Sequence, residues 1–129
     1  MSNRAVIHSS EAPQAIGPYS QAVKVNDTVW LSGQIPLDPA TMELVPGDAA
    51  AQAEQVFRNL AAVACAAGGD LNQFEKVNIY LTDLADFGAV NTVMARHFSE
   101  PYPARACVQV AALPRGARVE VEATMTLKP

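Results

Sequence analysis

Apolar and polar residues alternate along residues 103–110, near the carboxyl end of the chain. A two-residue period places successive side chains on opposite faces of a sheet, so this stretch is predicted to be a β-strand. One face is expected to be apolar and packed, with Ala106, Val108 and Val110. The opposite face is expected to carry chemistry, with Arg105, Cys107 and Gln109.

Residues 119–125 alternate in the same way and predict a second strand, with Glu120, Glu122 and Thr124 on its polar face. The connecting segment 111–117 contains a proline and a glycine, so we expect a turn between antiparallel neighbours. Arg105 and Glu120 would then lie on the same side of adjacent or nearby strands. They would form either a cross-strand ion pair, worth about 0 to 1 kcal/mol, or part of a functional site.

The rest of the chain predicts four more strands and two helices. The predicted order is a strand at 4–8, a hairpin of 20–25 and 28–33, a helix from Asp48 to Gly68, a strand at 74–82, and a helix from Asp83 to Phe98. Asn26 and Asp27 suit a tight hairpin turn, and both helices begin with an aspartate that can cap them. Apolar residues recur every three or four positions in both helices, so each is expected to bury one stripe.

Both predicted helices connect strands of one sheet. Such connections are right-handed as a rule, which places both helices on the same face of the sheet. The opposite face is therefore expected to lack cover from its own chain, and we expect a homo-oligomer whose sheets face one another. This uncovered face is predicted to carry Asn78, Tyr80, Arg105, Cys107, Gln109, Glu120 and Glu122.

Length and composition restrict the possible functions. The chain fits a single domain, residues 1–129, and its formal net charge of -4 disfavours a nucleic-acid partner, because phosphate binding depends on Lys and Arg. No stretch approaches the roughly 18 apolar residues of a membrane span, and the amino end lacks a signal-peptide core, so we expect a cytoplasmic protein without a membrane partner. Cys65, Cys107, His8 and His97 lack metal-site spacing, and we expect neither a disulfide nor a metal.

Four segments, in order, resemble those of a known family. They are IGPYSQA at 16–22, SGQIP at 32–36, PARACV at 103–108 and VEVEA at 119–123. These segments are similar to the hallmark segments of the Rid family, also called the YjgF family. The similarity spans nearly the whole chain and is greatest to the RidA-type members, which are reactive intermediate deaminases.

The resemblance implies both a fold and a reaction. The implied fold is chorismate-mutase-like and α+β, with one mixed sheet, two helices packed on one face, and a homotrimer whose sheets form a central barrel with three clefts between subunits. RidA-type proteins hydrolyse 2-iminobutanoate and 2-iminopropanoate to 2-keto acids and ammonia without a metal or cofactor. These imines come from enamines released by pyridoxal-phosphate-dependent dehydratases, so the implied role is control of metabolite damage.

The resemblance also implies roles for individual residues. Arg105 is expected to bind the substrate carboxylate through its planar fork, and Glu120 is expected to hold and polarise the attacking water. Cys107 is expected to act through its backbone carbonyl, near the imine nitrogen. Four further residues match positions that shape the pocket: Tyr19, Ser32, Gly33 and Asn91. From sequence alone, Tyr19 could equally be a packing residue and Asn91 a solvated or capping one.

Three other functions remain open at this point. The same clefts could hold a small keto acid in a non-catalytic trimeric binding protein. An RNA-directed ribonuclease or translation inhibitor is also ascribed to some relatives, although the acidic balance of this chain weighs against it. Finally, Cys107 could be a thiol nucleophile or redox sensor, although a cysteine inside a strand is more often a packing residue.

Overall fold

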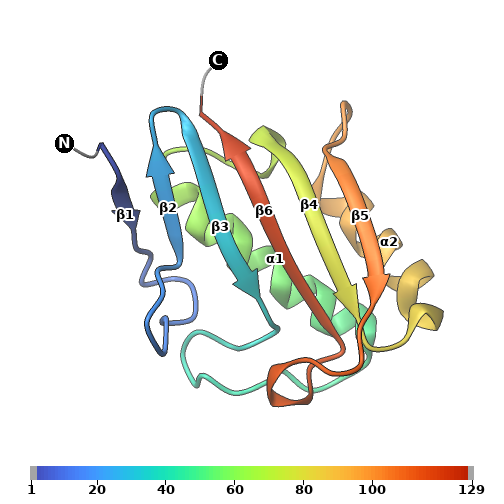
Figure 1. The fold of residues 1–129 in the computed structure, drawn as a ribbon. Coiled ribbons are helices and arrows are strands. Elements are labelled where there is room, and N and C mark those ends of the chain that lie inside the picture. Colours follow the sequence, from blue (N-terminus) through green and yellow to red (C-terminus); the bar gives the residue numbers. More distant parts are fainter. Residues whose placement is uncertain (1–2, 128–129) are drawn as a thin grey trace.

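A single six-stranded mixed sheet forms the front layer of the protein, as Figure 1 shows. The computed structural model describes residues 3–127. The strands are β1 (Ala5–Ile7), β2 (Ala22–Val25), β3 (Thr28–Gln34), β4 (Phe74–Leu81), β5 (Ala104–Gln109) and β6 (Val119–Thr126). Their order across the sheet is β1-β2-β3-β6-β4-β5, and every pair is antiparallel except β4 with β5.

Two helices form the second layer, behind the sheet in Figure 1. They are α1 (Ala49–Ala66) and α2 (Phe87–His97), and three single turns of 3-10 helix accompany them: η1 (Leu71–Gln73), η2 (Leu84–Asp86) and η3 (Pro114–Gly116). Both helices pack on the same face of the sheet, which confirms the predicted α+β class and layer arrangement. Within the described residues, neither helix has the length and apolar character that crossing a membrane requires.

Helix α1 fills the centre of the core. Its carboxylate cap is Asp48, whose Oδ1 accepts a hydrogen bond from the Ala51 amide at 3.0 Å, as its position before the alanine-rich run predicts. Its predicted apolar stripe is buried throughout: Ala53, Val56, Phe57, Leu60, Val63, Ala64 and Ala67. The sequence therefore located this helix and its buried face correctly.

Helix α2 begins one turn later than predicted. Asp83 accepts a hydrogen bond from the Ala85 amide at 2.9 Å, so it caps η2, and α2 starts at Phe87. The short turn of η2 places the amino end of α2 beside the outer strand of the sheet.

The predicted hairpin is confirmed: Val25 pairs with Thr28, and Asn26 adopts a φ of 54° at the turn.

The predicted pairing of the last two strands is wrong. β6 lies between β3 and β4, and β4 separates it from β5 (Figure 1). Because α2 connects β4 to β5 by a crossover, these two strands are parallel neighbours, and the chain then passes the end of β4 to insert β6 in the middle of the sheet. The apolar face of β6 is completely covered there, whereas β5 is an edge strand.

The predicted faces of β5 are also reversed. β5 pairs with β4, whose buried residues Val77 and Ile79 face the helices, and paired residues project to the same side of a sheet. Ala106 and Val108 therefore lie on the uncovered face, where Val108 is 47% exposed. The helix side of β5 carries the three residues that were expected on the uncovered face: Arg105, Cys107 and Gln109.

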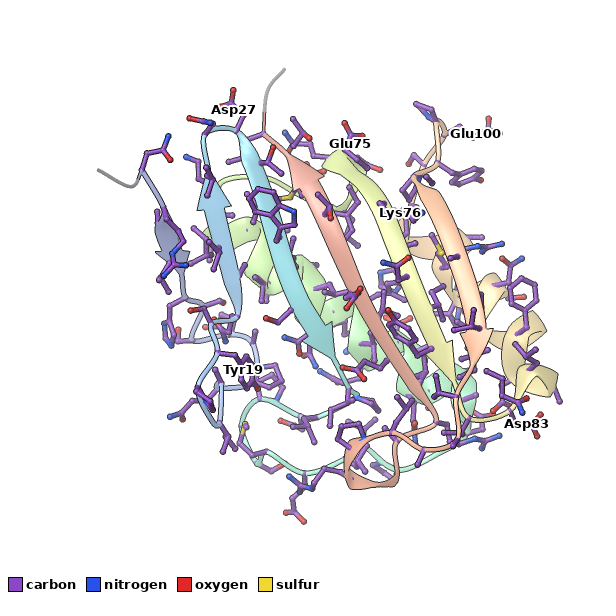
Figure 2. All side chains as sticks on the ribbon, viewed as in Figure 1. Tyr19, Asp27, Glu75, Lys76, Asp83 and Glu100 are labelled. Carbon is purple, nitrogen blue, oxygen red and sulfur yellow. The ribbon has the colours of Figure 1, made fainter. Side chains whose placement is uncertain are left out.

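Within the part of the chain that the structure describes, nothing covers the face of the sheet opposite the helices, as predicted. Figure 2 views the molecule from this side, with the side chains of the sheet in front and the helices behind. The residues that precede and follow each polar residue in β4 and β6 are buried against the helices. The polar residues therefore lie on this uncovered face, as expected: Asn78, Tyr80, Glu120 and Glu122. Trp30, 49% exposed, adds a large apolar surface to the same face.

Candidate functional site

The residues expected to form one site occupy two separate hollows of the chain. One is a cleft of about 650 Å³ where β3 ends and β6 begins. The other is a pocket of about 430 Å³ between α2 and β5. The cleft contains Tyr19, Ser32, Gly33 and Glu120, and the pocket contains Asn91 and Arg105.

A β-bulge in β3 shapes the cleft. Leu31 pairs with Ala123, but Gln34 pairs with Val121, so β3 carries one extra residue between these pairs. A bulge redirects side chains and locally opens the ladder. Here it brings Ser32 and Gly33 against the start of β6.

Gly33 lies directly beneath the Glu120 carboxylate. A Cβ added at residue 33 would overlap Oε2 of Glu120 and crowd the rest of that side chain. The space that a side chain would fill at residue 33 is therefore the space that this carboxylate occupies. The group that comes closest to Gly33 in the structure is thus a side chain of the same protein.

Two glutamates on β6 give the cleft its electrostatic character. Glu122 accepts hydrogen bonds from Nδ2 of Asn78 and from the hydroxyl of Tyr80, both at 3.1 Å. Burial raises the pKa of Glu120 above 4.5, and the charge of Glu122 raises it further. Burial, followed by the hydrogen bond to Glu122, likewise raises the pKa of Tyr80. Glu120 is thus the carboxylate in the cleft that binds a proton more readily than an ordinary glutamate.

A loop before β2 forms another wall of the cleft, and a buried glutamine holds it. The Gln21 side chain accepts a hydrogen bond from the Ser9 amide at 2.6 Å and donates to the carbonyls of Ser9 and Pro13 at 3.1 and 2.8 Å. Ser32 donates its hydroxyl to the Ser20 carbonyl at 2.6 Å, which ties the loop to β3. Tyr19, at the end of this loop, remains 52% exposed beside the cleft, so it is not a packing residue of this chain.

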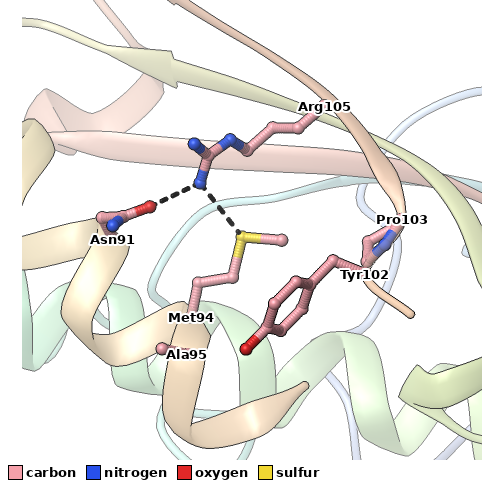
Figure 3. A pocket seen from close by; sticks show the side chains of 6 residues that line it. All are labelled: Asn91, Met94, Ala95, Tyr102, Pro103 and Arg105. Atoms are coloured by element: carbon pink, nitrogen blue, oxygen red, sulfur yellow. Dashed lines mark hydrogen bonds between the residues drawn. The ribbon is translucent and has the colours of Figure 1, made fainter. Parts of the chain in front are cut away.

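In the second hollow, α2 holds the side chain of Arg105, as Figure 3 shows. Nη1 of Arg105 donates to Oδ1 of Asn91 at 2.6 Å and to the sulfur of Met94 at 3.8 Å. The guanidinium carbon lies 5.2 Å from the centre of the Phe87 ring. Tyr102, Pro103 and Ala95 complete the lining of the pocket.

Cys107 lies two residues further along β5, on the same side as Arg105. Its side chain is partly buried against the core, and burial raises the pKa of its thiol, although the charge of Arg105 acts in the opposite direction. A reactive cysteine needs a thiolate at neutral pH, so this environment favours a packing role for the side chain. Gln109, expected in the cleft, instead accepts a hydrogen bond from the Leu84 amide at 2.9 Å and so holds η2.

Arg105 and Glu120 do not face each other within one chain. Arg105 pairs with Val77 on the helix side, whereas Glu120 pairs with Tyr80 on the uncovered side. The expected placement of both residues on one face is wrong, because β5 has the opposite phase to that inferred from alternation. Cys107 shares this correction, since it lies on the side of Arg105.

Sequence reasoning missed two residues that contact Arg105. Phe87 and Met94 belong to the apolar stripe that the sequence predicts for the second helix, and no site role was expected for them, yet both lie against the guanidinium. Their spacing with Asn91, at positions i, i+4 and i+7, places all three on one helix face and is the signal that could have linked them. Within residues 3–127 no cluster of three or more His, Cys, Asp or Glu side chains is suited to hold a metal ion.

Comparison with known proteins gives the family. The family described as Endoribonuclease L-PSP matches residues 9–127. Protein DfrA of Myxococcus xanthus is 58% identical over 122 residues, which cover 93% of both chains. The 2-iminobutanoate/2-iminopropanoate deaminase of Mus musculus is 49% identical over 126 residues, which cover 98% of this chain and 93% of the mouse protein.

The crystal structure of RidA from the Antarctic bacterium Psychrobacter sp. PAMC 21119 superimposes with a TM-score of 0.92 and 56% identity, covering 95% of this chain and 98% of that one. The chain belongs to the Rid family. The chorismate-mutase-like α+β fold implied by its four motif segments is thereby confirmed. The names of Rid relatives cover different activities, among them an endoribonuclease and a 2-iminobutanoate/2-iminopropanoate deaminase.

The raised pKa of Glu120 has a consequence for stability. Because folding raises this pKa, the ionised carboxylate destabilises the folded state at neutral pH, and this cost disappears as the pH falls from the folded pKa to the unfolded value near 4.5. We expect Glu120→Gln to unfold at a higher temperature than the wild type at pH 7. The difference between the two melting temperatures should shrink as the pH is lowered to 4, and calorimetry at fixed protein concentration measures it. A melting temperature of Glu120→Gln below that of the wild type at pH 7 would contradict the raised pKa of Glu120.

The contact between Gly33 and Glu120 can be tested with a matched pair of glycines. Gly33→Ala has to displace the Glu120 carboxylate, so the free energy of unfolding of this variant should lie below that of Gly88→Ala, which has open space around it and lies in α2, where alanine is favoured by about 0.5 to 1 kcal/mol. Denaturant unfolding at one protein concentration compares the two. Equal effects of both substitutions would show that Gly33 is not in close contact with Glu120.

Proposed function

We propose that this Rid protein hydrolyses small 2-imino acids to 2-oxo acids and ammonia, and that each active site is shared between two protomers of a homotrimer. The observation that carries the proposal is that one chain contains two separate parts of a site, the pocket with Arg105 and the cleft with Glu120, which we call half-sites. Arg105 is held in position by Asn91, with no ion pair to a carboxylate of the described residues, and Glu120 is a carboxylate of raised pKa above a glycine. One half-site suits a substrate carboxylate, and the other suits a water molecule.

Arg105 supplies the anchor for the substrate. A 2-imino acid carries a carboxylate next to the reactive C=N carbon, and a guanidinium binds such a group with two parallel hydrogen bonds. The C=N carbon is bonded directly to the carboxylate carbon, so binding the carboxylate also restricts where the reactive carbon lies. This positioning converts the attack of water into a reaction between groups that are already in place.

Glu120 acts on the water. The carboxylate removes a proton from water as the oxygen bonds to the iminium carbon and the C=N π electrons move to nitrogen, which gives a carbinolamine. Glu120 then gives this proton to nitrogen, ammonia leaves, and the hydroxyl passes its proton back to the Glu120 carboxylate as the 2-oxo acid forms. Transfer of that proton to the departing ammonia gives ammonium and restores the carboxylate. One water is consumed for each imine, and a carboxylate with a raised pKa is suited to these proton transfers.

The shared site explains why the two half-sites are separate in one chain. The uncovered sheet face, with Trp30 and Val108 exposed, provides a broad surface for sheets of neighbouring copies. In such an assembly β5 at the edge of one sheet brings Arg105 to the cleft of the next protomer. The backbone carbonyl of Cys107 would then lie near the iminium nitrogen, and Tyr19, Ser32 and Gly33 would form the opposite wall.

The chemistry of the substrate points to its source. A 2-imino acid is short-lived in water, so a protein that hydrolyses it acts beside enzymes that release it. Pyridoxal-phosphate-dependent dehydratases produce enamines that tautomerise to these imines, and they are the functional partners we propose. The mouse relative is named for this class of substrate.

The family description names an endoribonuclease, and the site supports this function less well. Glu120 and Glu122 both line the cleft, and the chain carries a net charge of -4. An RNA strand would bring further negative charge against these carboxylates, and Arg115 is the one basic side chain among the residues that line the cleft. A small carboxylate anchored by Arg105 meets no such obstacle.

Coupled turnover tests the reaction directly. With threonine and a purified threonine dehydratase, the protein should speed the disappearance of 2-iminobutanoate and the formation of 2-oxobutanoate. Glu120→Gln should lower this rate about 100- to 10,000-fold, because it removes the proton acceptor. Imine decay is followed in the presence and absence of the protein, and decay at the buffer rate with folded wild-type protein would exclude the proposed activity.

Subunit mixing tests the shared site. Arg105→Ala and Glu120→Gln should each be inactive alone. When the two variants are mixed in equal amounts, unfolded and refolded together, one site in four combines an intact arginine with an intact glutamate from the other protomer. The refolded mixture should therefore recover about a quarter of the wild-type activity. The control is a mixture that is not unfolded. Refolded mixtures that stay inactive, with their oligomeric state retained, would place both residues of a site in the same protomer.

A further inference from the structure

We propose that Phe87 and Met94 are positioning residues, which together with Asn91 determine the edge of the Arg105 guanidinium that meets the substrate. We call these three residues the α2 cradle. The inference rests on the proposed binding of a carboxylate by Arg105. It adds two residues and a defined orientation to that binding.

The contacts of the cradle are concentrated on one nitrogen. A guanidinium has five N–H donors, two of them on Nη1. Nη1 donates to Asn91 at 2.6 Å and to the Met94 sulfur at 3.8 Å (Figure 3). The guanidinium carbon lies over the Phe87 ring, 5.2 Å from its centre. The edge formed by Nε and Nη2, with two parallel donors, is therefore the edge left for a carboxylate.

The cradle is uncharged, and this distinguishes Arg105 from Arg118 and Arg58. Arg118 forms a bidentate ion pair with Asp86, with its shortest N–O distance at 2.8 Å, and Arg58 pairs with Glu54 at 3.1 Å. An amide, a thioether and an aromatic ring hold Arg105 instead, and within residues 3–127 no carboxylate pairs with it. The geometry of Arg105 is fixed while its charge remains available for an incoming anion.

All three residues of the cradle come from one face of α2, so the position of this helix sets the position of the whole cradle. Positions i, i+4 and i+7 lie along one side of a helix, and the crossover between parallel β4 and β5 places that side above Arg105. A long arginine side chain otherwise samples many rotamers, and ordering it on binding weakens affinity. The cradle orders the side chain before the substrate arrives.

A matched set of aromatic substitutions tests the role of Phe87. Phe87→Leu should raise KM for 2-iminobutanoate about fivefold and leave kcat within about twofold, because it removes the aromatic face beneath the guanidinium. Phe87→Tyr should restore KM. Phe98→Leu is the control, because Phe98 is buried against Phe57 and Phe74, so this change should lower the melting temperature and leave KM unchanged. Equal KM values for Phe87→Leu and wild type, or equal increases in Phe87→Leu and Phe98→Leu, would overturn the proposal.

The neutral character of the cradle is tested at residue 91. Asn91→Asp places a carboxylate 2.6 Å from the guanidinium, so it should raise KM at least about tenfold near pH 7, and the loss should diminish at pH values that protonate the new aspartate. An unchanged KM at pH 7 would overturn the role of neutrality.

Binding of 2-oxobutanoate, measured by titration calorimetry, separates this inference from the proposed reaction. If the wild type binds the oxo acid without hydrolysing imines, the proposed activity fails, and the dissociation constants of the same variants test the cradle. We then expect Phe87→Leu and Asn91→Asp to weaken binding by the same factors as above, with Phe98→Leu unchanged. Equal dissociation constants in all four proteins, or no binding by the wild type, would overturn the cradle.

Discussion

The parallel pairing of β5 with β4 is the constraint on which the arrangement of the site depends. α2 must lie between these two strands in the sequence, so it crosses over the sheet and covers the edge where β5 lies. The pairing fixes the phase of β5, and this phase turns Arg105 toward α2 and away from Glu120. A shift of one residue in this register would place the guanidinium on the uncovered face and remove it from Asn91 and Phe87.

The opposite half of the proposed site depends on an irregularity of the sheet. The bulge in β3 brings Gly33 under the carboxylate of Glu120, at a place where regular pairing would continue the ladder. The protein accepts a partly buried glutamate beside a second glutamate there, and the raised pKa of Glu120 reflects this cost. Tyr80 and Asn78 stabilise Glu122 by hydrogen bonds, so of the two carboxylates Glu120 is the one left to act on a ligand.

Arg105 and Arg118 differ in the charge of the groups that hold them. The bidentate pair of Arg118 with Asp86 joins the start of β6 to the start of α2 and stabilises the fold. Arg105 instead rests on uncharged groups, which hold its direction without cancelling its charge. In a protein of net negative charge, a positive group that no carboxylate of residues 3–127 pairs with is suited to attract a small anion.

The sequence alone determined the elements, the layers and the family. Asp48 and the apolar stripe of α1, the hairpin at Asn26, and the alternation of β6 follow from local rules, and each was located correctly because each depends on neighbours close in the chain. The four motif segments likewise identified the Rid family.

Strand adjacency and the phase of β5 were decided only by tertiary structure. β5 is short and exposed at an edge, with small residues such as Ala104 and Ala106, so its alternation carries too little difference in hydrophobicity to show which face is buried. The crossover through α2 and the insertion of β6 beside β4 settle that question, because they bring together residues that are distant in the sequence.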